Sequence, residues 1–321
     1  MTKYQQSPLS SRGLTTREIA EHLQEIYDIE VSPMFITRAT DSIKAEIDAW
    51  RSRSLEKVYA IVYFDGIRFN IRESATVKNS VVYVALGVDL TGKQDVLGLW
   101  HAETESASFW ANVCIDLNSR GVSDILISCV DGLTGLPEAI NAVFPKTDIQ
   151  LCVVHQIRNS CKFVSYKDRK NFCVDLKSIY CAQSVLEAEM SLKTLQDNWN
   201  KKYPASVKSW VNNFDKVTTF FKYPVELRKI IHTTNSIEAL NSVLRKNTKN
   251  RKVFTSFDSL NKILVLNIQR ITNKWTTKQN WGIIYNQLAL LFGDRIKLDP
   301  LDFSDSTSKT VSGLVSAFTQ N

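Results

Sequence analysis

The chain has 321 residues, of which 44% are hydrophobic and 23% are charged. This balance excludes wholesale disorder, and the length suits one large domain with a small appendage. Lys and Arg outnumber Asp and Glu by 40 to 33, and the resulting net charge of +7 favours a polyanionic partner.

Two further features bear on the compartment. No stretch approaches the roughly 18 to 20 consecutive apolar residues that span a bilayer, and the first eight residues lack the apolar core of a secretory signal. The six cysteines include no Cys-x-x-Cys pair; they are Cys114, Cys129, Cys152, Cys161, Cys173 and Cys181. We therefore expect a cytoplasmic protein with reduced thiols and no membrane partner.

Residues 1–52 are predicted to hold a small helical unit. Thr15-Thr16-Arg17-Glu18 is a capping box followed by apolar residues at helical spacing, and Ser32-Pro33 begins a second helix that carries Arg38. Two short helices with a tight joint indicate a helix-turn-helix, with Arg38 as a DNA contact. A plain helical hairpin packed on the main domain fits the same spacing equally well.

Residues 53–153 read as strands and helices in the order β-β-β-α-β-α-β. The strands are predicted at 57–64, 80–88, 96–100, 125–130 and 148–153, and the helices at 106–119 and 137–143. The segment Asp89-Leu90-Thr91-Gly92 is typical of a hairpin turn. Three meandering strands followed by crossover connections predict an α/β fold, a mixed sheet with helices on both faces.

The rest of the chain is predicted to be helical. Residues 154–231 show no convincing strand and exceed an ordinary connection, so we interpret them as an all-helical insertion. Residues 232–292 continue as helices, and residues 293–321 form a Ser- and Thr-rich tail.

Two aspartates follow apolar strands. Asp65 comes after the run 59–64 and Asp131 after the run 125–130. Each is followed by glycine, so a strand-ending turn explains either one alone. Together they indicate more, because the first and fourth strands of this arrangement lie side by side in parallel. The two carboxylates would then reach one ion, which offsets their desolvation.

A third acid is expected from a helix on the same side. Thr233-Thr234-Asn235-Ser236 is a helix-start signal, and Glu238 lies in the first turn, on a polar face shared with Asn235, Asn241, Ser242 and Arg245. Glu238 alone could simply complement the helix dipole. With the two aspartates, it completes a carboxylate set suited to two-metal phosphoryl transfer with Mg²⁺ or Mn²⁺.

Basic residues near these acids are candidate DNA contacts. His155, Arg158 and Lys162 share one helical face, and residues 245–252 hold five cations: Arg245, Lys246, Lys249, Arg251 and Lys252. A solvated face explains the first group equally well. Cys152-x-x-His155 is half a zinc site, but no second pair follows at suitable spacing, so zinc is disfavoured.

Six blocks resemble the Mutator-type transposases of bacterial insertion sequences. They lie at 62–65, 83–88, 96–100, 129–140, 151–159 and 233–241, and they include Cys129-Val130-Asp131-Gly132 and Asn235-Ser236-Ile237-Glu238. The likeness runs from about residue 13 to 292, in order and with family-like spacing. The Cys152-x-x-His155 pair is also a family feature.

The resemblance implies an RNase H-like fold interrupted by a helical insertion before the last acid. It implies a DDE active site at Asp65, Asp131 and Glu238, binding to the element's inverted repeats, cleavage at its ends and joining to target DNA. It also implies a homodimer or higher oligomer on DNA. Gly66 stands where the family usually has alanine, and family members carry a further N-terminal stretch.

Two other functions stay open at this point. The first alternative is an N-terminally shortened, catalytically impaired copy that acts as a DNA-binding regulator. The second is a structure-selective nuclease that cuts without joining. The intact acids argue against the first of these.

Overall fold

The computed structural model describes residues 16–27, 32, 34, 44–73, 76–102, 106–231 and 235–296. In the N-terminal unit it shows two helices, α2 (Thr16–Tyr27) and α4 (Lys44–Ser52). The second helix predicted for a helix-turn-helix, with Arg38, lies outside the described residues. The helix-turn-helix therefore stays a prediction, and so does the tail beyond residue 296.

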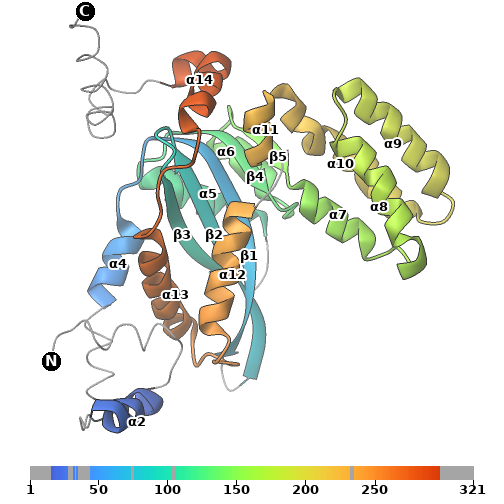
Figure 1. Cartoon of the computed structure of the whole chain (residues 1–321). Helices are drawn as coiled ribbons and strands as arrows, with labels where there is room; N and C mark the ends of the chain where they lie inside the picture. Colours follow the sequence, from blue (N-terminus) through green and yellow to red (C-terminus); the bar gives the residue numbers. More distant parts are fainter. Residues whose placement is uncertain are drawn as a thin grey trace, which may run out of the picture.

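A five-stranded mixed sheet forms the centre of the molecule (Figure 1). The strand order is β3-β2-β1-β4-β5; the first three strands in the chain pair antiparallel, whereas β1, β4 and β5 run parallel. The strands are β1 (Val58–Glu73), β2 (Thr76–Asp89), β3 (Gln94–Ala102), β4 (Asp124–Val130) and β5 (Asp148–Leu151). The predicted element order and the parallel neighbourhood of the first and fourth strands are confirmed.

The hairpin between β2 and β3 forms as expected at residues 89–92. The Asp89 carboxylate accepts hydrogen bonds from the backbone N–H groups of Thr91 and Lys93, at 2.8 and 3.0 Å. Gly92 adopts a φ of 83°, which costs glycine little because it has no Cβ. The Trp281 ring packs against this glycine, and its indole N–H donates to the carbonyl of Leu90.

Helices cover both faces of the sheet. The side chains of Phe64 and Tyr63 point to opposite faces of β1, as the two-residue period of a strand requires. Phe64 packs edge-on against Trp110 in α5 (Ala107–Ser119), beside α6 (Leu136–Val143). The Tyr63 hydroxyl donates to the carbonyl of Ile230, on the face covered by α12 (Asn235–Thr248) and α13 (Phe257–Thr272).

Strand β1 continues well beyond the predicted end at residue 64. Its pairing with β4 ends at Tyr63 and Cys129, while its pairing with β2 continues to Glu73. Farther along the same edge, Phe254 takes the place of a strand: its N–H donates to Asn70 and its carbonyl accepts from Arg72. Asp65 lies in the interval between these two partners and inside β1, so the alternative that Asp65-Gly66 forms a strand-ending turn is wrong. Asp131, by contrast, directly follows β4.

The predicted helical character of residues 154–231 is confirmed, since residues 153–231 are fully described and contain helices and no strand. Its elements are α7 (Val153–Cys161), α8 (Tyr166–Tyr180), α9 (Val185–Trp199), α10 (Pro204–Val217), a 3-10 helix (Thr218–Lys222) and α11 (Val225–Ile231). Figure 1 shows α7 to α10 projecting to one side of the sheet. Trp210, Phe220, Phe221 and Tyr223 are buried in it, so they form its core.

The described chain ends with α14 (Trp281–Phe292) and a short 3-10 helix (Gly293–Arg295). Among the described residues, no helix combines the length and the apolar character needed to cross a membrane.

Candidate active site and metal centre

Asp65 is a nearly buried carboxylate on the central strand. Its side chain is 7% exposed, because β2 and α12 enclose it. The backbone N–H of Gly66 donates to Oδ1 at 2.8 Å, and Asn241 Nδ2 donates to Oδ2 at 2.6 Å. Burial raises the pKa of Asp65, and the neighbouring Asp131 carboxylate adds to this, against the effect of the two hydrogen bonds.

Asp131 and His155 form a close pair beside Asp65. His155 lies in the first turns of α7, which follows β5 after Cys152, and its Nδ1 is 2.9 Å from Asp131 Oδ1. Burial lowers the pKa of His155, but the hydrogen bonds with Asp131 and Cys152 outweigh it and raise the pKa to about 10. Asp131 directly follows β4, and His155 follows β5 in the next helix. Because β4 and β5 are parallel, both residues lie beyond the same end of the sheet.

Glu238 lies in the first turn of α12, as predicted, on the other side of the His155 ring. Its Oε1 is 3.7 Å from His155 Nε2 and accepts a hydrogen bond from Arg158 Nη1 at 2.9 Å. The ligand atoms of Asp65, Asp131 and His155 all lie within 4.8 Å of one another. Glu238 is outside that closest group, because His155 stands between it and Asp131.

All three predicted acids line one cavity of about 280 Å³. Its lining is almost wholly polar, and comprises Asp65, Gly66, Asp131, His155, Arg158, Glu238, Asn241 and Arg245. The amide oxygen Asn241 Oδ1 is buried and has no hydrogen-bond partner among the described residues. Converging carboxylates with a buried, unpaired oxygen fit a divalent cation that prefers oxygen ligands. The residues present therefore suit a metal ion.

Sequence reasoning missed Asn241 as a site residue and placed His155 among the DNA contacts. In the structure Asn241 contacts Asp65, and His155 contacts Asp131 inside the acidic cluster. The available signals were spacing and type: Asn241 is three residues after Glu238 on the same helix face, and His155 follows Cys152 by three. The group of described residues that could hold a metal contains no cysteine, and all six cysteines are free thiols.

The predicted DNA contacts take several different positions. Arg158 and Arg245 line the acidic cavity, and Lys162 contacts Asn159 on the exposed side of α7. The remaining members of the basic run differ in exposure: Lys246, Lys249 and Lys252 are exposed, whereas Arg251 is half-buried with its guanidinium over the Phe254 ring. Burial lowers the pKa of Arg251.

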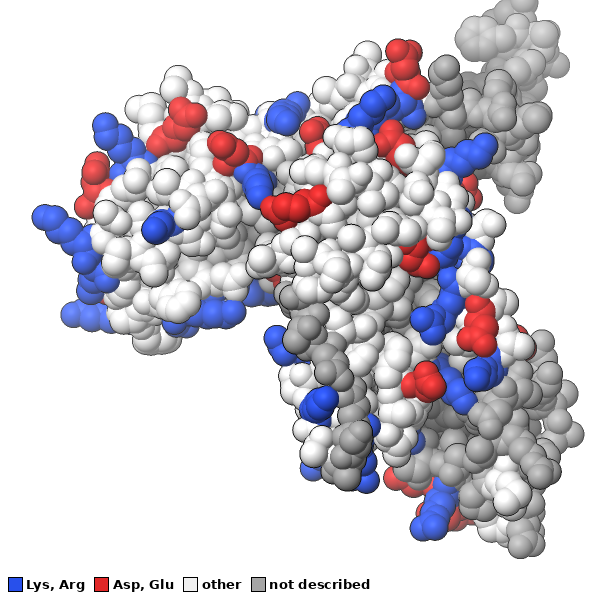
Figure 2. Space-filling model, turned by 180° about the vertical axis from the view of Figure 1, so that it is seen from behind, with Lys and Arg blue, Asp and Glu red and all other residues white. Residues whose placement is uncertain are grey.

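The helical insertion carries the positive charge of the chain. Residues 153–231 contain 14 Lys and Arg and 7 Asp and Glu, so their net charge of +7 equals that of the whole sequence. Figure 2 shows Lys and Arg side chains along the outer edge of this lobe. Arg158 of the insertion lines the carboxylate cavity itself, so positive charge from the insertion is present where a polyanion would meet the acids.

The fold and the cluster define a mixed α/β protein with a candidate metal centre at one edge of its sheet. A family model described as "Transposase, Mutator family" matches residues 8–278. The chain belongs to the Mutator family of transposases.

Similar proteins from several bacteria agree with this assignment. The chain is 45% identical over 290 residues to the transposase for insertion sequence element ISRM3 of Rhizobium meliloti, covering 89% of this chain and 72% of that protein. It is 38% identical over 308 residues to a probable insertion-sequence transposase of Corynebacterium diphtheriae, covering 89% and 90% of the two chains. A transposase of Lactococcus lactis is 29% identical over 257 residues, which cover 80% of this chain and 65% of that protein.

Proposed function

We propose that the chain is a DDE transposase with an RNase H-like core, which cleaves DNA at insertion-sequence ends and joins the freed 3′-hydroxyl to target DNA. The observation that carries the proposal is the meeting of Asp65, Asp131 and Glu238 around one cavity. These residues are separated by 66 and 107 positions in the sequence, so their convergence requires the whole fold. Structural acids would not need a shared polar cavity.

The carboxylates of Asp65, Asp131 and Glu238 would hold Mg²⁺ or Mn²⁺, since hard oxygen ligands favour these ions. When bound, two such ions activate the attacking oxygen and stabilise the leaving oxygen of a phosphodiester. His155 orients Asp131 through its Nδ1, and Asn241 orients Asp65 through its amide N–H. Both contacts fix the carboxylates before substrate arrives, which lowers the reorganisation needed during the reaction.

Positive side chains near the acids would place the DNA. Arg158 and Arg245 line the same cavity and supply the positive charge that a scissile phosphate requires. The exposed cations Lys246, Lys249 and Lys252 extend this surface along α12 and beyond its end. The partners are then the element's inverted repeats and target DNA, and we infer a homodimer or higher oligomer that pairs two ends.

A strand-transfer assay tests the proposal. The full chain is incubated with Mg²⁺ or Mn²⁺, a labelled duplex carrying the terminal inverted repeat that flanks the reading frame, and a target plasmid. We expect cut and joined products from the wild type. Asp131→Asn and Glu238→Gln should lower both by at least about 1,000-fold, because each removes a charge that holds the metal.

Matched controls come from α9 of the insertion. Asp197 and Glu189 are exposed, so Asp197→Asn and Glu189→Gln remove the same charges far from the cavity and should keep full activity. Joined product at wild-type level in Asp131→Asn contradicts the site assignment. Cutting without joining indicates a structure-selective nuclease, and binding without either product indicates a DNA-binding regulator.

A further inference from the structure

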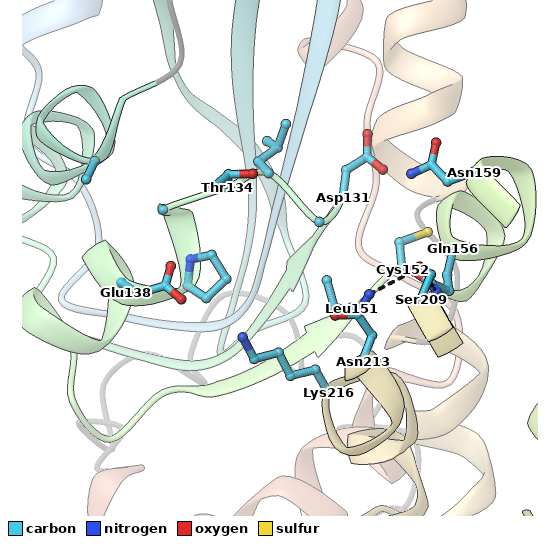
Figure 3. A pocket seen from close by; sticks show the side chains of 15 residues that line it. Asp131, Thr134, Glu138, Leu151, Cys152, Gln156, Asn159, Ser209, Asn213 and Lys216 are labelled. Carbon is cyan, nitrogen blue, oxygen red and sulfur yellow. Dashed lines mark hydrogen bonds between the residues drawn. The ribbon is translucent and has the colours of Figure 1, made fainter. Parts of the chain in front are cut away.

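A second, larger cavity of about 490 Å³ adjoins the acidic one, and Asp131 lines both. On one side lie the loop 131–135 and the start of α6; on the other lie α7 and α10 of the insertion. Figure 3 shows Thr134 and Glu138 on one side, and Gln156, Asn159 and Asn213 on the other, with Asp131 at one end in this view. A DNA strand held at the acidic cavity would therefore lie next to this second cavity.

Two helices turn polar stripes toward this space. On α7 and its N-cap the stripe is Cys152, Gln156 and Asn159; on α10 it is Ser209, Asn213 and Lys216. Both sets have the spacing i, i+4, i+7, the period at which packed helices usually place apolar residues. Here the apolar stripe of α10, with Trp210, is used separately in the core of the insertion. The two polar stripes therefore line the cavity.

The hydrogen bonds in the cavity leave one acceptor and one donor without a protein partner among the described residues. Gln156 is fully engaged: its Nε2 donates to Ser209 at 2.9 Å, and its Oε1 accepts from Asn213 Nδ2 at 3.3 Å. Asn213 Oδ1 and Lys216 Nζ have no partner among the described residues. An acceptor and a donor that line the same cavity suit the mixed donor and acceptor pattern on the edge of a nucleobase. The walls at Leu133, Pro137 and Leu151 are apolar, as the faces of a base require.

We propose that this cavity receives one unpaired nucleobase, that of a nucleotide flanking the scissile phosphate. The inference rests on the proposed transposase function and adds a second binding site for the same DNA strand. A volume of about 490 Å³ lies in the range of small-ligand sites and admits a base with its sugar. Enzymes that modify a base hold it unpaired in a shaped pocket, where hydrogen bonds and packing replace its pairing and stacking, and the same interactions would hold an unpaired base beside a cleavage site.

Fluorescence of 2-aminopurine tests the proposal without cleavage, because this base emits more strongly once it leaves the stack. Duplexes carrying the terminal repeat are labelled at one position at a time around the cleavage site and bound to the full chain in Ca²⁺. We expect one position to give a clear gain. The gain should fall about five-fold in Asn213→Leu and in Lys216→Ala, which each remove one polar contact to the base.

Controls on the same helix separate this role from folding and from general DNA binding. Asn212 and Lys208 are exposed on α10 and do not line the cavity, so Asn212→Leu and Lys208→Ala should keep the gain. A gain at no position, or one that Asn213→Leu and Lys216→Ala leave unchanged, overturns the inference. Cleavage of the unlabelled duplex in Mg²⁺ is measured in parallel. If the duplex is cleaved but no fluorescence gain appears, the base pocket alone is refuted. If the chain fails both to bind and to cleave the duplex, both proposals are refuted.

Discussion

Replacing Asp65 by asparagine should stabilise the metal-free protein while it abolishes cleavage. Asp65 is 7% exposed, and burial together with the Asp131 charge raises its pKa. An amide has the same shape and still accepts from the Gly66 N–H. Its NH₂ group can donate to Asn241 Oδ1 after rotation of the Asn241 amide, and this bond replaces the one that Asn241 Nδ2 donates to Asp65. The substitution thus removes a buried charge and keeps the number of hydrogen bonds between residues 65 and 241 unchanged.

The expected gain in the free energy of unfolding is about 1–2 kcal/mol, because the amide avoids the cost of burying a charged carboxylate. For a chain of this size, each kcal/mol of added stability raises the Tm by roughly 2–4 °C. The pH dependence has a definite sign. Because the pKa of Asp65 is higher in the folded than in the unfolded protein, its ionisation destabilises the fold at neutral pH and not in acid. The advantage of Asp65→Asn should therefore shrink as the pH falls below the raised pKa.

Thermal unfolding in EDTA and in excess Mn²⁺ measures both effects. Metal should raise the Tm of the wild type, because an ion present at 100 times its Kd contributes about 2.7 kcal/mol to stability. The same metal concentration should raise the Tm of Asp65→Asn much less. Asp197→Asn, an exposed change on α9, serves as the control and should follow the wild type in both buffers. Lower stability of Asp65→Asn in EDTA, or equal stabilisation of both proteins by Mn²⁺, would refute the reasoning.

Two further predictions concern the turn after β2 and the site arginine. Gly92→Ala should lose roughly 2–4 kcal/mol of stability, because its φ is 83° and a Cβ would lie 2.3 Å from Trp281 Cγ. In Gly282→Ala, the added Cβ inside α14 would have no heavy atom within 4 Å, so this variant should gain up to about 1 kcal/mol of stability. Equal Tm values for the Gly92→Ala and Gly282→Ala variants would contradict the packing. Arg158→Ala breaks the contact with Glu238, but Arg158 is 56% exposed, so stability should change by less than about 1 kcal/mol. For the Arg158→Ala variant, the slope of log affinity for DNA against log salt concentration should decrease in magnitude by about 1. An unchanged slope argues against a phosphate contact.

The sheet could be predicted from the sequence because its signals are local. Continuous apolar runs mark β1 and β4, and the Asp-Leu-Thr-Gly segment marks the turn before β3. The length of β1 could not be predicted, because its continuation past Asp65 depends on pairing with β2 and on a hydrogen-bonded segment at Phe254, 183 positions after Ile71. Such long-range pairing overrides the local turn preference of Asp65-Gly66.

The amino-acid sequence by itself determined the order of the elements, the helical character of residues 154–231 and the placement of acids after two apolar runs and in the first turn of a helix, since periodicity and capping residues act over a few positions. Only the tertiary structure decided which side chains meet. Asn241 reaches Asp65 across 176 positions, and His155 enters between Asp131 and Glu238. These contacts depend on how α7 and α12 pack against the sheet edge, and packing is a property of the assembled core that no single segment contains.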